Sequence, residues 1–218
     1  MRTAEQPFRF HTASYLTRVG NQKATCLTEL CDGIRNCSDA SIFYHTYHSL
    51  SRLHYLTEGF SNDFAQWALA ACNRPGLAEE LAAIDIREYV NLAALRGDLC
   101  RIVSTYCLNH PREGEHTAFE PFYFLEGVGV AIPLGIEAKT LEEFRRAMER
   151  LSHASFHYHF IASRLRLQLR TNDFSLWLTK MFGLEALARS VNRIDIYTHT
   201  LESAQKVLAT LIDRELRR

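Results

Sequence analysis

The chain has 218 residues, of which 47% are hydrophobic, and this is enough for one large domain or two small ones. Its 25 Lys and Arg residues balance its 25 Asp and Glu residues, so the basic excess that drives binding of nucleic acid is absent. No stretch approaches the roughly 18 apolar residues that span a bilayer, and the N-terminus lacks the apolar segment of a signal peptide. We therefore expect a globular cytoplasmic protein that binds neither nucleic acid nor a membrane.

Six cysteines form no C-x-x-C pair and no zinc-ribbon spacing. We interpret them as reduced thiols that pack as small hydrophobic side chains, as expected in the cytoplasm. They are Cys26, Cys31, Cys37, Cys72, Cys100 and Cys107.

The segment SIFYHTYHSLSRL, residues 41–53, predicts a helix with a polar stripe. Its Ser41, His45, His48 and Arg52 are spaced by four, three and four residues, which places them on one helical face. The question is whether this stripe is a binding site or part of a core.

Further helices are expected after it. Asn62-Asp63 is typical of a helix start, because short polar side chains cap the first turn and carboxylates favour its positive end. Asp85, in the IDI segment at 84–86, is expected to cap the following helix. The last element of this half shows apolar residues at helical spacing, namely Leu95, Leu99, Ile102 and Val103.

The second half repeats these signals after a Pro- and Gly-containing linker, NHPREGEHTAF, at 109–119. The even-numbered apolar residues of PFYFLEGVGVAIP predict a short strand or a hairpin arm that ends at Pro133. Thr140 and Glu143 form a capping-box pattern that should open a helix. The remaining helix signals are Asn172-Asp173, Asp195 as a cap, and the spacing of Ala204, Leu208, Leu211 and Ile212.

The chain contains an internal duplication of about 100 residues. Residues 41–53 and 155–167 match at six of thirteen positions, where chance predicts roughly one. PFRF (7–10) aligns with PFYF (121–124), and SNDFAQW (61–67) with TNDFSLW (171–177) at an offset four residues smaller. We therefore expect about one extra helical turn in the first copy, near HYLTEGF.

The predicted fold is mainly α, or α+β at most, with two duplicated helical units related by a pseudo-two-fold axis. Each unit should have about five helices and a short N-terminal β element. The predicted boundaries are 1–110 for the first repeat, 111–120 for the linker and 121–218 for the second repeat.

The motifs PFYF, SIFYHTYH, NDFAQW and IDIREY, in this order, resemble an uncharacterised prokaryotic family known as domain of unknown function 5752. The resemblance covers nearly the whole chain. It implies a YYH-like element and an NDF element in each half, and no assigned reaction; for some members it also implies a location near carbohydrate-active genes. The chain keeps Tyr44-His45 and Tyr158-His159, but Phe43 and His157 precede them and Ala162 stands opposite His48.

The stripe gives two interpretations of the candidate residues. As a site, the imidazoles would bind a metal or move a proton, and the arginines would hold a phosphate or carboxylate. In a structural role, His45 and His159 would pair with Asp63, Asp173, Asp85 or Asp195 and so hold helices together. The candidate ligand-binding residues are Tyr44, His45, Arg52, Tyr158, His159 and Arg166.

A metal ion is a further option, because His45 and His48 supply two ligands at a usable spacing. The candidate metal set is His45, His48, His159 and Asp63. Other cofactors are unknown. The chain has no Gly-rich phosphate loop, G-x-S-x-G or H-E-x-x-H motif, so the three enzyme classes that these motifs mark have no support. A Cys-His catalytic pair stays open, since its members need only meet in space.

These features support two alternative hypotheses for the function. The first is a non-catalytic binding or accessory module for a small anionic or carbohydrate-type ligand, or for a partner enzyme. The second is a metal-dependent enzyme with a histidine/carboxylate site between the repeats. The expected partners are a small molecule or a partner protein, and a homodimer is left open.

Overall fold

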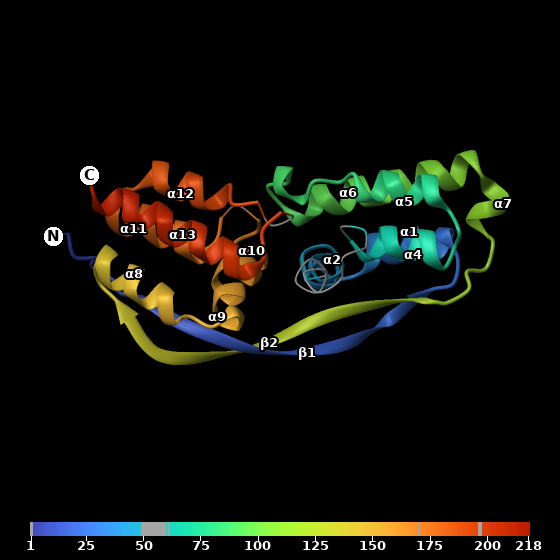
Figure 1. Cartoon of the computed structure of the whole chain (residues 1–218). Helices are drawn as coiled ribbons and strands as arrows, with labels where there is room; N and C mark the ends of the chain where they lie inside the picture. The colour runs from blue at the N-terminus through green and yellow to red at the C-terminus, as the bar shows by residue number, and fades with distance from the viewer. Residues whose placement is uncertain (1, 49–59, 61, 170, 196–197) are drawn as a thin grey trace. The chain divides into compact units, whose positions relative to one another are not determined.

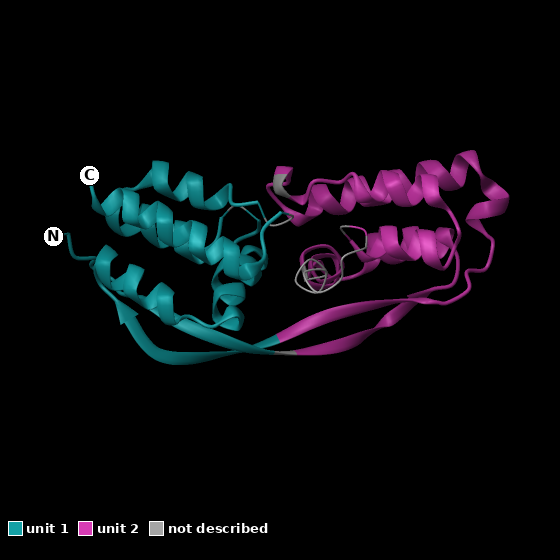
Figure 2. Ribbon diagram, viewed as in Figure 1, with its two compact units in different colours: residues 1–15, 129–218 teal, residues 16–128 magenta. Residues whose placement is uncertain are grey.

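The computed structural model describes residues 2–48, 60, 62–169, 171–195 and 198–218. The chain divides into two compact units (Figure 2). Unit 1 comprises residues 1–15 and 129–218, and unit 2 comprises residues 16–128. These boundaries differ from those of the predicted repeats, because the first 15 residues belong with the second helical half. The ranges 1–110, 111–120 and 121–218 therefore stay a prediction about the sequence repeats.

The only sheet in the described part of the chain is a ribbon of two long strands, β1 (Phe8–Ala24) and β2 (Phe122–Ala138) (Figure 1). The strands are antiparallel, because Arg9 pairs with Glu137 near one end and Arg18 pairs with Glu126 further along. The expectation of a short strand ending at Pro133 was wrong, since β2 continues to Ala138. Proline is tolerated there because both strands of a two-stranded ribbon are edge strands.

Unit 2 is helical apart from its part of the ribbon. Its helices are α1 (Leu27–Asn36), α2 (Asp39–Phe43), the π-helix η1 (Tyr44–His48), α4 (Asp63–Ala70), α5 (Pro75–Ala82), the 3₁₀-helix η2 (Ile86–Glu88), α6 (Leu92–Asn109) and α7 (Pro111–Gly114). The core lies between α1 and α6, where Leu30, Ile34, Leu95 and Leu99 are fully buried. The short α7 occupies part of the predicted linker.

Unit 1 has the same helical character. Its helices are α8 (Leu141–Arg150), α9 (His153–His157), the π-helix η3 (Tyr158–Ala162), α10 (Ser163–Arg166), α11 (Asp173–Phe182), α12 (Glu185–Asn192) and α13 (Leu201–Leu216). Phe144 of α8, Phe174 of α11, and Leu208 and Ile212 of α13 are fully buried in its core. The mainly helical fold class is thus confirmed.

The predicted helix starts are confirmed where polar side chains cap backbone N–H groups. Asn62 accepts from Ala65 N and opens α4, and Asn172 opens α11 in the same way. Thr140 forms a capping box with Glu143 at the start of α8.

The two aspartates of the IDI segments do not cap the next α-helices, contrary to the sequence prediction. Asn91 caps α6 and Thr200 caps α13. Asp85 instead precedes the single 3₁₀ turn of η2, so a short irregular segment separates it from α6. Among the residues that the structure describes, no helix has the length and apolar content needed to cross a bilayer.

Candidate functional site

A buried histidine in unit 2 joins three segments of the chain. The side chain of His45, in η1, is 2% exposed, and its Nδ1 lies 2.8 Å from Oδ2 of Asp63 in the first turn of α4. The backbone N–H of Leu125 in β2 donates to His45 Nε2 at 2.8 Å. Because a backbone N–H can only donate, Nε2 is the acceptor and Nδ1 holds the hydrogen that it donates to Asp63. His45 is therefore held as a neutral imidazole with both ring nitrogens bonded.

The same arrangement occurs in unit 1. Nδ1 of His159, in η3, lies 2.8 Å from Oδ2 of Asp173 in α11, and the backbone N–H of His11 in β1 donates to Nε2 at 2.8 Å. Burial lowers the pKa of His159, and this outweighs the opposing effect of Asp173. The pairing of both histidines with aspartates, predicted as their structural role, is confirmed.

Each polar stripe begins in a short α-helix that a π-helical turn follows. Ser41 in α2 and Ser155 in α9 are buried, and Ser155 donates its hydroxyl hydrogen to the carbonyl of His11. The prediction of α-helix over both stripes is thus only partly correct, since η1 and η3 follow α2 and α9. A π turn inside a helix often accompanies a functional site.

Two members of the first stripe cannot be placed. Arg52 and the predicted extra turn near HYLTEGF lie outside the described residues, and so does the side chain of His48. In the second stripe, Arg166 is 43% exposed and its Nη2 donates to Asp173 Oδ2 at 2.7 Å. The role of Arg52 as a ligand-binding residue stays a prediction.

The two candidate tyrosines differ in their surroundings. Tyr44 is buried, and its hydroxyl lies 3.3 Å from Oγ1 of Thr17 in β1. Tyr158 is half-buried, and the guanidinium carbon of Arg166 lies 4.5 Å from the centre of its ring. This cation–π contact helps to fix Arg166 beside Asp173.

The proposed metal set of His45, His48, His159 and Asp63 is divided between the units, since His159 belongs to unit 1. Within the described ranges, no group of three or more His, Cys, Asp or Glu side chains is arranged to hold a metal ion. The metal-dependent enzyme stays a prediction.

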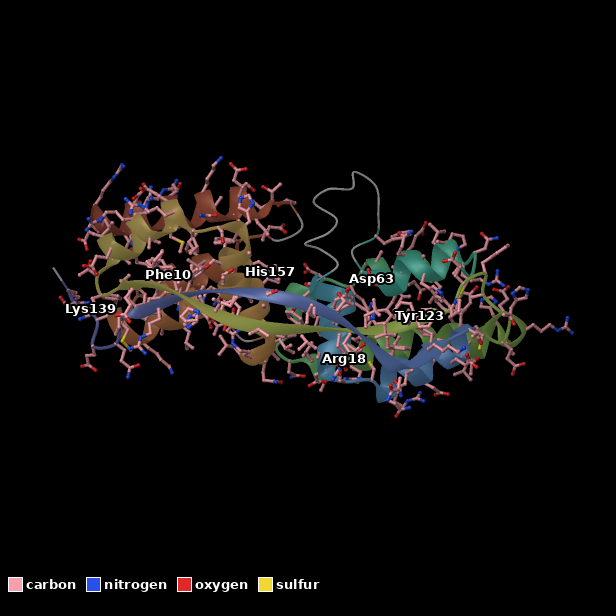
Figure 3. The ribbon with its side chains drawn as sticks, turned by 90° about the horizontal axis from the view of Figure 1, so that it is seen from below. Phe10, Arg18, Asp63, Tyr123, Lys139 and His157 are labelled. Atoms are coloured by element: carbon pink, nitrogen blue, oxygen red, sulfur yellow. The ribbon has the colours of Figure 1, made fainter. Side chains whose placement is uncertain are left out.

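A pocket of about 730 Å³ opens beside the His45–Asp63 pair in unit 2. Phe119, which is 92% exposed, and Tyr123, which is 49% exposed, present aromatic rings there (Figure 3 labels Asp63 and Tyr123). Buried Trp67 lines it too, and its indole N–H donates to the Glu120 carbonyl at 2.7 Å. The lining residues are His45, Asp63, Gln66, Trp67, Ala70, Ala71, Phe119, Glu120, Pro121, Phe122, Tyr123 and Leu125.

The polar groups of this pocket are acidic or neutral. Its lining includes the acidic residues Asp63 and Glu120 and the amide residue Gln66. Among the described residues that line it, none is Lys or Arg.

Sequence reasoning missed Phe119, Glu120 and Tyr123 as site residues. Phe119 and Glu120 lie in the segment interpreted as a linker. The signal for Tyr123 was present, because Phe122 and Phe124 are buried and the residue between them must point to the opposite face.

Comparisons with known proteins agree with the motif resemblance. The model of a family of unknown function, DUF5752, matches residues 5–213. A solved structure described as that of OrfY from Thermoproteus tenax is similar, with a TM-score of 0.85 and 31% sequence identity. The match covers 97% of this chain and 96% of that one. No curated protein matches.

Proposed function

The chain belongs to the family of unknown function DUF5752, and from that premise we propose that it is a binding module whose pocket in unit 2 takes a neutral carbohydrate-type ligand. The observation that carries the proposal is the exposed aromatic pair, Phe119 and Tyr123, beside the polar groups of Asp63, Gln66 and Glu120. A partner enzyme and a homodimer stay predictions.

The size of the pocket supports a small-molecule ligand. Ligand pockets in proteins have volumes of roughly 300–1,000 Å³, and this one has about 730 Å³. Such sites combine apolar and aromatic walls with a few polar groups, which is the composition found around Trp67 and Phe122.

The chemistry of the lining supports a sugar over the anionic alternative. The C–H faces of a sugar ring pack on aromatic rings, and its hydroxyl groups donate hydrogen bonds to carboxylate and amide oxygens. An anion would instead meet the carboxyl groups of Asp63 and Glu120 with no Lys or Arg among the described lining residues. This repulsion gives specificity against phosphorylated ligands.

The bonding of His45 supports binding over proton transfer. Its Nδ1 donates to Asp63 and its Nε2 accepts from Leu125, so either step of acid–base catalysis would first break a buried hydrogen bond. The ring is better suited to fixing β2 and α4 on either side of the pocket.

Calorimetric titration with neutral oligosaccharides and with the corresponding sugar phosphates tests the proposal. We expect a neutral member to bind and its phosphate to bind at least about tenfold more weakly. Replacement Phe119→Ala should weaken binding by about tenfold, because one stacking ring is lost.

Arg9→Ala is the control outside the pocket, because Arg9 lies in unit 1 and pairs with Glu137 on an exposed surface. This variant should bind like the wild type. Equal affinity of the Phe119→Ala variant, or preference for the phosphates, would contradict the proposed site.

We also propose that the two units descend from an internal duplication. In each unit a histidine joins an aspartate to a strand N–H, as described above. Trp67 donates to the Glu120 carbonyl, and Trp177 donates to the Gln6 carbonyl, which stands at the aligned position. Residues that align between the repeats thus make equivalent contacts. In both cases the helices of one repeat pack against the first strand residues of the other repeat.

A further inference from the structure

Two cysteines on neighbouring helices of unit 2 make reciprocal contacts. Cys31 lies in α1 and Cys100 lies in α6, and these helices pack together. The Sγ of Cys31 is 3.8 Å from the Cys100 carbonyl oxygen, and the Sγ of Cys100 is 3.9 Å from the Cys31 carbonyl oxygen. Each sulfur therefore lies beside the backbone of the other cysteine across the interface between α1 and α6.

The pKa values of the two thiols are shifted in opposite directions. The hydrogen bond from Cys100 is the largest effect that lowers the pKa of Cys31 to about 7, with help from Arg35, whose Nη2 is 3.6 Å from its sulfur. Burial and Asp32, which pairs with Arg35, act in the opposite direction. The pKa of Cys100 is raised by its bond to Cys31 and by burial, against the effects of Arg35 and Arg96.

Three other thiols of unit 2 differ from Cys31 in the direction of their pKa shift. Burial raises the pKa of Cys72 to about 12 and also raises the pKa values of Cys37 and Cys107. Because the thiolate is the nucleophile, reactivity at neutral pH should concentrate at Cys31. Cys31 is 6% exposed, so a small reagent is the fitting reaction partner.

We propose that Cys31 and Cys100 form a redox-active dithiol that a hydroperoxide converts into a disulfide between α1 and α6. The Cys31 thiolate attacks one peroxide oxygen, the O–O bond breaks, and the departing oxygen takes a proton and leaves as water or an alcohol. Cys31 becomes a sulfenic acid. The Cys100 sulfur then attacks Cys31, the S–S bond forms, and the hydroxyl of the sulfenic acid leaves as water with the Cys100 proton.

Treatment of the folded full-length chain with hydrogen peroxide, followed by thiol blocking and peptide mass spectrometry, tests the assignment. We expect a peptide pair cross-linked through Cys31 and Cys100. Before oxidation, the rate of alkylation of Cys31 should rise through a midpoint near pH 7, whereas that of Cys72 should stay low over this range.

Two variants separate the roles of the thiols. Cys100→Ser should leave Cys31 as a sulfenic acid that dimedone traps, and no disulfide should form. Cys107→Ser is the matched control on α6 and should still give the Cys31–Cys100 disulfide. The proposal is overturned if the wild type gives no such cross-link, or if Cys31 is alkylated no faster than Cys72. Both measurements use the wild-type chain, so they do not depend on whether a variant folds.

Discussion

At the scale of single residues, His45 and His159 each bond to an aspartate and to a strand N–H. The aspartate partners could be predicted, because they belong to the NDF motifs that recur beside each polar stripe. The strand partners could not, because Leu125 and His11 contribute only backbone groups and lie far away in the sequence. The pocket beside His45 was also not predicted, because it depends on which distant strand segment packs against α4.

The lowered pKa of His159 predicts a dependence of stability on pH. An unfolded histidine has a pKa of about 6.5, so as the pH falls the unfolded chain takes up this proton before the folded chain does. The contribution of neutral His159 is complete above about pH 6.5 and is lost as the pH falls toward the folded pKa. Urea unfolding between about pH 7 and about pH 5 should therefore show a shallower loss of stability for His159→Gln than for the wild type.

The control for this experiment is His153→Gln, because His153 is exposed at the start of α9. This variant should keep the wild-type dependence on pH. An unchanged slope in His159→Gln would show that His159 does not titrate differently in the folded protein.

Truncation of His45 should lower the free energy of unfolding. His45→Ala leaves the half-buried Leu125 N–H without its acceptor and removes the bond to Asp63, which predicts a loss of about 1–3 kcal/mol. Denaturant unfolding measures it. His116→Ala, at an exposed position, should change stability by no more than about 0.5 kcal/mol, and an equally small effect at His45 would refute the structural role.

At the scale of elements, the close approach of α1 to β2 depends on Gly33. A Cβ added there would lie 2.2 Å and 2.3 Å from two carbons of the Phe124 ring, which is buried and cannot move aside. Gly33→Ala should therefore destabilise the protein by about 1–3 kcal/mol in a denaturant titration.

Gly97→Ala is the matched control on α6, because a Cβ there meets no atom within 4 Å. It should stabilise the protein by about 0.5–1 kcal/mol, since alanine is the better helix former. Effects of the same sign in both variants would contradict the packing of α1 against Phe124.

The helices could be predicted better than the strands. Caps such as Asn62, Asn172 and Thr140 act within one helical turn, so local sequence determines them. The length of β1 and β2 was not predictable from periodicity, because every described position of β2 from Val128 to Glu137 is exposed and no face is selected for apolar residues.

At the scale of the whole molecule, the unit boundaries predict the effect of removing the N-terminus. Phe8 contacts the rings of Phe144, Phe174 and Trp177 in unit 1, and the His11 N–H bonds to His159. Deletion of residues 2–15 should abolish hydrogen-exchange protection in α8 and α11 while α1 and α6 keep theirs.

Hydrogen-exchange mass spectrometry of the deleted and full-length chains makes this measurement. Loss of protection in α1 and α6 as well would show that the units unfold together. Retained protection in α8 would show that β1 does not complete the core of unit 1. The sequence repeats could not predict this outcome, because they do not specify which strand segment packs with which helices.

Unit 2 is one continuous segment, whereas unit 1 is made of two segments that flank it. On the ribosome, unit 2 and its pocket are therefore complete once residue 128 has emerged. Residues 1–15 lack their packing partners until residues 129–218 have been synthesised. At typical translation rates this wait lasts on the order of ten seconds. Throughout that interval the nascent chain exposes Phe8 and Phe10 to solvent and to neighbouring chains. We expect this short N-terminal segment to be where a chaperone holds the newly made protein.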